Sequence, residues 1–171
     1  FGIQSRGGCS CAGPYGHRLL GIDLDTSHEF EREIALGCEG IKPGWVRVNF
    51  NYFITEQVFD YVVGAVDLVA THGWRLLDDY RFDVASGLWR HVEGPLDPPL
   101  SLHEVSYADG RMAWPDRRRR MGDDELADVL AQGREVLLAG AGRPGERPDT
   151  TDDFEHLRWF PLPGEVVTGP G

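Results

Sequence analysis

Residues 55–73 read TEQVFDYVVGAVDLVATHG and carry the clearest secondary-structure signal in the chain. Thr55 is a good helix N-cap, because its hydroxyl can accept a hydrogen bond from a backbone N–H of the first turn. Gly73 is a typical residue to follow a helix. We therefore expect a helix that ends at about His72. The apolar residues within it recur at helical spacing and predict one broad buried stripe, made of Val58, Phe59, Val62, Val63, Val66, Val69 and Ala70.

Upstream of this helix, the pattern predicts two strands and two shorter helices. Residues 1–5 favour extended structure, and residues 45–50 alternate between an apolar and a mixed face, as a strand does. A short helical pattern covers residues 14–20. Thr26 followed by Glu29 forms a capping box, so a second helix is expected to begin there.

Downstream, the sequence predicts two hairpins, a helix and a last strand. Asp109-Gly110 is a typical two-residue hairpin turn between runs rich in aromatic and β-branched residues. The expected elements are a hairpin of 74–82 with 88–91, a hairpin of 102–107 with 111–114, a helix over 124–138 and a strand within 154–162. Strands and helices do not alternate regularly. The pattern therefore favours an α+β fold, with a small antiparallel or mixed sheet covered by helices.

The composition argues against several classes of protein. The chain has 171 residues and a formal net charge of −11, which disfavours binding to nucleic acid. Its basic run, Arg117–Arg120, is followed at once by acidic residues and is typical of a solvated loop. Asp60 and Asp67 interrupt the apolar stretch, so we expect no membrane span of ~20 residues. Three cysteines and no visible secretory signal favour free thiols and a cytoplasmic protein.

The segment SRGGCSCAGPYGH at residues 5–17 combines glycines with side chains that can bind metals. A single Cys-x-Cys pair does not match the usual spacing of structural zinc sites, and it is weak evidence for a redox site. Glycines permit a tight backbone path, and a buried cysteine is commonly inert. Residue types alone leave the metal, redox and structural interpretations open for Cys9, Cys11, His17 and Cys38.

Two stretches follow the pattern of a known family: FGIQSRGGCSCAGP at 1–14 and GWVRVNFNYF at 44–53. They resemble the C-terminal domain of the class V aminotransferase family of pyridoxal-phosphate enzymes, which includes the cysteine desulfurases and selenocysteine lyase. The first stretch is similar to the family's strand, arginine, glycine-rich loop and cysteine-containing segment. The second is similar to the strand that carries the arginine for the substrate carboxylate. The resemblance covers about residues 1–92 and implies the small domain of a fold-type I enzyme.

The resemblance implies roles for individual residues. Arg47 would bind the α-carboxylate of an amino-acid substrate, a role suited to a planar guanidinium on a strand. Arg6 and His17 are further candidate substrate-binding residues, and their charge would favour ionisation of a nearby thiol. Cys11 takes the position of the loop cysteine that receives sulfur as a persulfide in one branch of the desulfurases. The family assigns no role to Cys9.

The same resemblance implies that catalysis needs another domain. In the family, a large N-terminal domain supplies the Schiff-base lysine and most of the pyridoxal-phosphate site. The only lysine here is Lys42, which lies in a different segment. We therefore expect a detached substrate-binding domain that is inactive alone, binds no cofactor covalently and belongs to a homodimer when the N-terminal cofactor domain is present.

Residues 93–171 lie outside the resemblance. We expect 93–139 to form an extension with a hairpin and a helix, and 140–171 to hold a linker, the last strand and a tail. The alternative hypothesis is a non-enzymatic α+β binding or interaction module. In that case the hairpins around Trp89 and Trp114 would form a partner surface.

Overall fold

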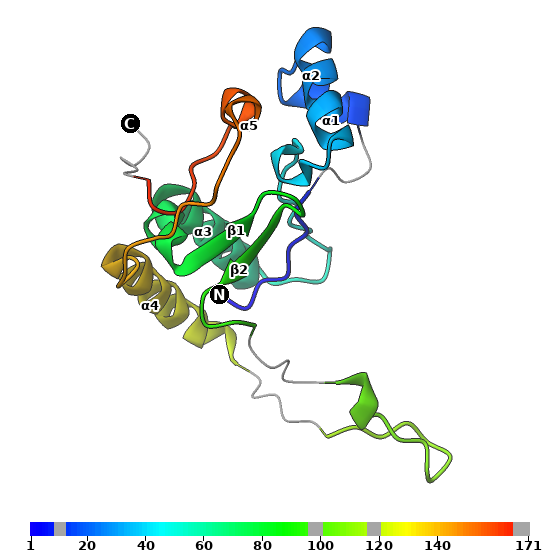
Figure 1. Ribbon diagram of the computed structural model, residues 1–171. Coiled ribbons are helices and arrows are strands. Elements are labelled where there is room, and N and C mark those ends of the chain that lie inside the picture. Colours follow the sequence, from blue (N-terminus) through cyan, green and yellow to red (C-terminus); the bar gives the residue numbers. More distant parts are fainter. Residues whose placement is uncertain (9–12, 96–100, 116–120, 166–171) are drawn as a thin grey trace.

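The computed structural model describes residues 1–8, 13–95, 101–115 and 121–165. Its longer elements, in chain order, are α1 (Gly13–Leu19), α2 (Leu24–Ala35), α3 (Glu56–His72), β1 (Tyr80–Asp83), β2 (Leu88–His91), α4 (Leu126–Ala139) and α5 (Asp152–Leu157). Short 3-10 helices cover Glu39–Ile41, Gly73–Asp79, Leu102–Glu104 and Asp123–Glu125. Figure 1 shows α3 and α4 side by side, the β1–β2 hairpin in front of α3, and residues 101–115 apart from these elements. The helices and the two-stranded antiparallel sheet make an α+β architecture, as the sequence predicts.

The helix expected from residues 55–73 is confirmed. The Thr55 hydroxyl accepts a hydrogen bond from the Val58 N–H at 3.2 Å and donates one to Asp123 at 2.7 Å. These bonds connect the start of α3 to the turn before α4. Tyr61 and Ala65 are the buried side chains of α3. Neither α3 nor another helix in the described ranges is long and apolar enough to cross a membrane.

The predicted buried stripe of α3 is wrong, because much of it faces solvent. Gly64 lies against Leu130 of α4, so α4 covers the side of the helix that carries Tyr61. Successive helical residues are about 100° apart, which points Phe59 and Tyr61 in nearly opposite directions. A helix that is apolar on two faces is typical of one that is covered on both. The exposed fractions on the uncovered face are 41% for Phe59, 46% for Val63, 47% for Val66 and 49% for Val69.

Several predicted strands are also wrong. Residues 1–5 and 45–50 form no strand, and their neighbourhood contributes a single bridge between Arg6 and Arg47. Most of residues 74–82 is a 3-10 helix, so only the end of this segment enters the hairpin with 88–91. In the second predicted hairpin, a 3-10 helix replaces the first strand, and a single bridge joins Ser106 to Ala113.

Two helix starts depend on caps that the sequence analysis assigned differently. The prediction of a last strand within 154–162 is wrong, because residues 154–157 belong to α5 and 158–162 form neither a helix nor a strand. The Thr151 hydroxyl caps α5 by accepting the Phe154 N–H at 3.2 Å. Acidic residues in its first turn further favour a helix N-terminus. Asp23 caps α2 by accepting the Thr26 N–H at 2.8 Å, so the predicted cap at Thr26 is wrong. The helix expected over 124–138 is confirmed as α4 and the turn before it.

The hydrophobic core forms where α2, the β1–β2 hairpin and α5 meet. Phe82 of β1 lies 6.2 Å from Phe154 of α5 and 4.7 Å from Trp89 of β2, measured between ring centroids. The segment after α5 therefore closes the core over the hairpin. The buried members of the core are Phe30, Ile41, Phe82, Phe154, Leu157 and Leu162.

Arg158 holds the segment after α5 in place. Its guanidinium donates to the carboxylates of Glu155 and Glu165, at 2.8 Å in each case, and to the Phe160 carbonyl. Arg147 pairs with the same two carboxylates at 3.0 Å. The charges of Arg158 and Glu165 are mostly shielded from water, so each depends on the other for compensation.

We expect Arg158→Ala to lower the free energy of unfolding by about 2–3 kcal/mol, because it leaves two partly buried carboxylates without their main partner. Urea unfolding followed by circular dichroism measures this loss. Arg81→Ala is the matched control, since Arg81 is 69% exposed and 3.6 Å from Glu146. It should change stability by less than about 0.5 kcal/mol. Equal losses in both variants would contradict the role of Arg158.

Stability should also fall in acid. The Thr150 hydroxyl, with Arg158 and Arg147, lowers the pKa of Glu155 to about 2. A carboxylate whose pKa is lower in the folded state stabilises the fold above its unfolded pKa and loses that contribution as the pH falls. We therefore expect the wild-type unfolding free energy to decline between about pH 5 and about pH 2, and that of Glu155→Gln to decline less. Parallel urea-unfolding profiles across this range would show that Glu155 is not responsible.

Candidate functional site

The two segments that carry the predicted arginines lie side by side. The Arg6 N–H donates to the Arg47 carbonyl at 3.1 Å, and the Arg47 N–H donates to the Arg6 carbonyl at 2.8 Å. The Trp45 N–H donates to the Gly8 carbonyl at 3.2 Å. These bonds form a short antiparallel ladder, here called the arginine ladder, in which Arg6 faces Arg47 and Gly8 faces Trp45.

Glycines make this close approach possible. A Cβ atom on Gly44 would lie 2.7 Å from the carbonyl carbon of Gly8, and the backbone there has no flexible side chain to move away. A Cβ atom on Gly16 of α1 would lie 2.6 Å from the Trp45 ring. Gly16 and Gly44 therefore serve packing, in agreement with the structural interpretation of these glycines.

The ladder places Arg6 and Arg47 on the same face. Residues directly opposite each other in an antiparallel pair project their side chains to the same side. Both arginines are exposed, and within the described residues neither forms an ion pair with a carboxylate. Two like charges in this position repel each other. The arrangement is therefore suited to an anion that both guanidinium groups bind.

His17, the other predicted substrate-binding residue, makes its contacts with α2. Its Nδ1 lies 2.7 Å from the Ser27 hydroxyl, and its ring centroid lies 6.4 Å from that of Phe30. The side chain is half-buried between α1 and α2. These contacts give His17 a packing role, and its role toward a substrate stays a prediction.

Of the three cysteines, the structure describes only Cys38. Cys11, the candidate persulfide cysteine, and Cys9 lie outside the described residues. Cys38 is half-buried, and burial together with the Glu33 carboxylate raises the pKa of its thiol. A thiol with a raised pKa is a weaker nucleophile at neutral pH. In the part of the chain that the structure describes, His, Cys, Asp and Glu side chains form no group of three that could hold a metal ion.

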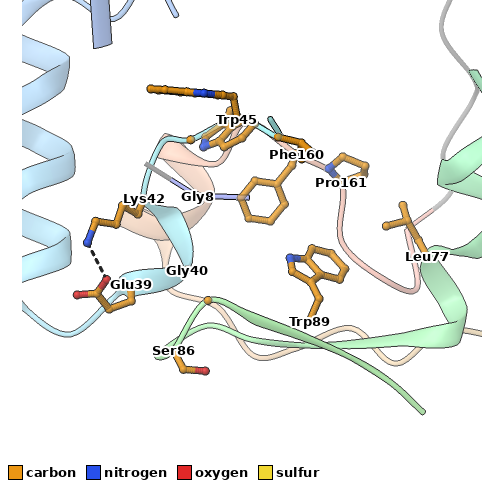
Figure 2. A pocket seen from close by; sticks show the side chains of 14 residues that line it. Gly8, Glu39, Gly40, Lys42, Trp45, Leu77, Ser86, Trp89, Phe160 and Pro161 are labelled. Atoms are coloured by element: carbon orange, nitrogen blue, oxygen red, sulfur yellow. Dashed lines mark hydrogen bonds and ion pairs between the residues drawn. The ribbon is translucent and has the colours of Figure 1, made fainter. Parts of the chain in front are cut away.

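A pocket of about 500 Å³ opens beside the arginine ladder. Figure 2 shows the Trp45, Trp89 and Phe160 side chains around this space, with Gly8 between them. Trp159 also lines it, and its ring lies 5.4 Å from Phe160 in an edge-to-face arrangement. Four aromatic side chains from three distant segments of the chain therefore line the pocket, together with glycines and the smaller apolar residues Val46, Leu77 and Pro161. We call it the aromatic pocket.

Its rim carries one ion pair. Lys42 donates to the Glu39 carboxylate at 3.2 Å, and both residues line the pocket (Figure 2). The two charges compensate each other. The interior of the aromatic pocket therefore offers apolar surface, with a polar edge whose charges are already paired.

The sequence analysis did not identify Trp45, Trp159 or Phe160 as site residues. One local signal was present, because Trp45 is two positions before Arg47 and residues at this spacing share one face of an extended segment. No local pattern connects them with Trp159 and Phe160, which follow α5. The closure of the core by α5 brings these residues together.

We compared the chain with models of protein families, with curated proteins and with solved structures, and found no match in any of the three comparisons.

We expect Gly44→Ala to loosen the arginine ladder, because the added methyl group would overlap the Gly8 carbonyl. The Arg6 and Arg47 amides should then exchange with deuterium about ten times faster or more, as hydrogen-exchange NMR would measure. Gly7→Ala is the control, since no atom lies within 4 Å of a Cβ at that position. Unchanged exchange in Gly44→Ala would contradict the close approach of the two segments.

Proposed function

We propose that this chain is the substrate-binding small domain of a pyridoxal-phosphate enzyme of the class V aminotransferase type, and that it binds the α-carboxylate of an amino acid. The observation that carries the proposal is the pairing of Arg6 with Arg47 through mutual backbone hydrogen bonds. The family resemblance assigns the carboxylate to Arg47. The ladder supports this assignment by putting a second guanidinium directly opposite.

A carboxylate suits this pair for two reasons. A guanidinium is a planar donor whose parallel N–H groups match the two oxygens of a carboxylate. An anion placed between Arg6 and Arg47 also offsets the repulsion of two opposed positive charges. The backbone hydrogen bonds between the two arginines fix the points from which their side chains extend. Substrate binding then costs less conformational entropy.

We propose that the pyridoxal phosphate is held mainly by a partner domain. The cofactor requires a lysine for its Schiff base, and Lys42 is the only lysine of the sequence. Its ammonium group is paired with Glu39 at the rim of the aromatic pocket. We therefore assign the cofactor and its chemistry to a partner domain, and substrate binding to the present chain.

The uncovered apolar face of α3 supports a partner domain. The Phe50 ring extends this face, because its centroid lies 4.9 Å from that of Phe59. Apolar patches of this kind mark interaction surfaces, and we propose that the cofactor-binding domain covers this one.

In the enzyme assembled with its cofactor domain, Arg47→Ala should lower kcat/KM for the amino acid by about 100- to 1000-fold, because a charge-assisted bidentate bond is lost. Arg47→Lys should recover only part of the activity, since an ammonium keeps the charge but not the planar fork. The absorbance of the bound cofactor should stay unchanged in both variants.

Arg134→Ala serves as the control for these kinetics. Arg134 is exposed on α4, so its loss should leave kcat/KM within about twofold of wild type. Normal turnover of amino acids by Arg47→Ala would show that the carboxylate assignment is wrong.

A second candidate function is a non-enzymatic interaction module. The observation that favours it is the segment 101–115, which lies apart from the body of the chain and exposes Tyr107, Met112 and Trp114 (Figure 1). The two functions predict different effects of the substitution Trp114→Ala. An interaction module should lose its partner in Trp114→Ala, whereas amino-acid binding at the arginine ladder should be unaffected.

A further inference from the structure

The aromatic pocket adjoins the arginine ladder, because Gly8, Gly44 and Trp45 line it, although Arg6 and Arg47 are not among its lining residues. Gly8 faces Trp45, and Arg6 faces Arg47, so the two rungs are separated by two residues. Side chains two residues apart in an extended segment point to the same side and lie about 6.6 Å apart. A carboxylate bound to Arg47 would therefore lie close to Trp45, which forms one wall of the pocket.

We propose that the aromatic pocket receives the side chain of the amino-acid substrate, and that this side chain is aromatic. The inference rests on the proposed function, because it takes the α-carboxylate to lie on Arg47. It adds the substrate class, which the arginine pair does not define since every amino acid carries the same carboxylate.

The size and lining of the pocket select this class. A volume of about 500 Å³ lies within the range of small-molecule sites and accommodates an aromatic ring. Aromatic rings gain from offset or edge-to-face contacts beyond the burial of their area. Trp89 and Phe160 already adopt such an edge-to-face contact, with ring centroids 6.1 Å apart. An aromatic side chain would add further contacts of the same kind.

The polar rim does not favour a charged side chain. The Lys42 ammonium and the Glu39 carboxylate pair with each other, so either one would have to give up its partner to bind a charged group. A short side chain such as that of alanine would leave the rings uncovered. Trp159 is 54% exposed, so an aromatic ligand could bury apolar surface of this side chain that a short side chain would leave in contact with water.

Binding to the 171-residue chain tests the inference, with tryptophan fluorescence and isothermal titration calorimetry as readouts. The probes are L-phenylalanine, L-alanine and phenethylamine, which is phenylalanine without its carboxylate. We expect L-phenylalanine to bind about 30-fold more tightly than L-alanine, because only the former buries a ring. Phenethylamine should bind more weakly than L-phenylalanine, since it has no group for Arg47.

Two pairs of variants separate the pocket from the carboxylate site. Trp159→Ala should weaken L-phenylalanine binding at least fivefold, and Trp159→Leu should weaken it less because apolar bulk remains. Trp114→Ala is the matched control, a tryptophan that is 45% exposed but lies outside the pocket. Arg47→Ala should remove the preference for L-phenylalanine over phenethylamine, whereas Arg134→Ala, at an exposed position on α4, should not.

The outcomes distinguish the two proposals. Equal affinity for L-phenylalanine and L-alanine, or no saturable response to any probe, overturns the aromatic pocket as a side-chain site. If L-phenylalanine and phenethylamine bind equally and both respond to Trp159→Ala, the pocket assignment is supported and the carboxylate assignment to Arg47 is overturned.

Discussion

The meeting of residues 6–8 with residues 44–47 depends on the absence of side chains where the two backbones come closest. A Cβ atom at Gly44 would be 2.7 Å from the Gly8 carbonyl carbon, well inside van der Waals contact. With glycine there, three backbone hydrogen bonds can form. They align Arg6 with Arg47 and fix Trp45 at the edge of the aromatic pocket. The arginine pair and the Trp45 side of the aromatic pocket thus both require that residue 44 has no side chain.

The rest of the fold supports this site from a distance. Phe154 and Leu157 of α5 fill the core against the hairpin, and the chain after them returns past the hairpin with Trp159 and Phe160. Arg158 holds this segment in place by pairing with Glu155 and Glu165. By contrast, α3 is covered on one side only. A chain that exposes this much apolar surface is well suited to pack against a further domain, as the proposed function requires.

Local signals in the sequence predicted the helices well where caps and periodicity agreed. Thr55 and the apolar spacing after it defined α3, and the pattern after residue 123 defined α4. The expectations for 1–5, 45–50 and 154–162 failed, because a short apolar or alternating run is compatible with a strand, a turn or a helix. For 154–157, the capping hydroxyl of Thr151 favours a helix. For 1–5 and 45–50, no described segment provides the continuous partner that a strand needs.

The sequence by itself determined the α+β class and the positions of the main helices, since these follow from residue type and spacing along a short stretch, and a family resemblance added two arginines worth testing. Only the tertiary structure decided which face of α3 is buried, that Arg6 and Arg47 are opposite each other, and that Trp45, Trp89 and Phe160 share a pocket. These are contacts between residues far apart in the chain. They depend on how the α2–hairpin–α5 core closes and on backbone approaches that glycine permits, and neither leaves a periodic pattern in the sequence.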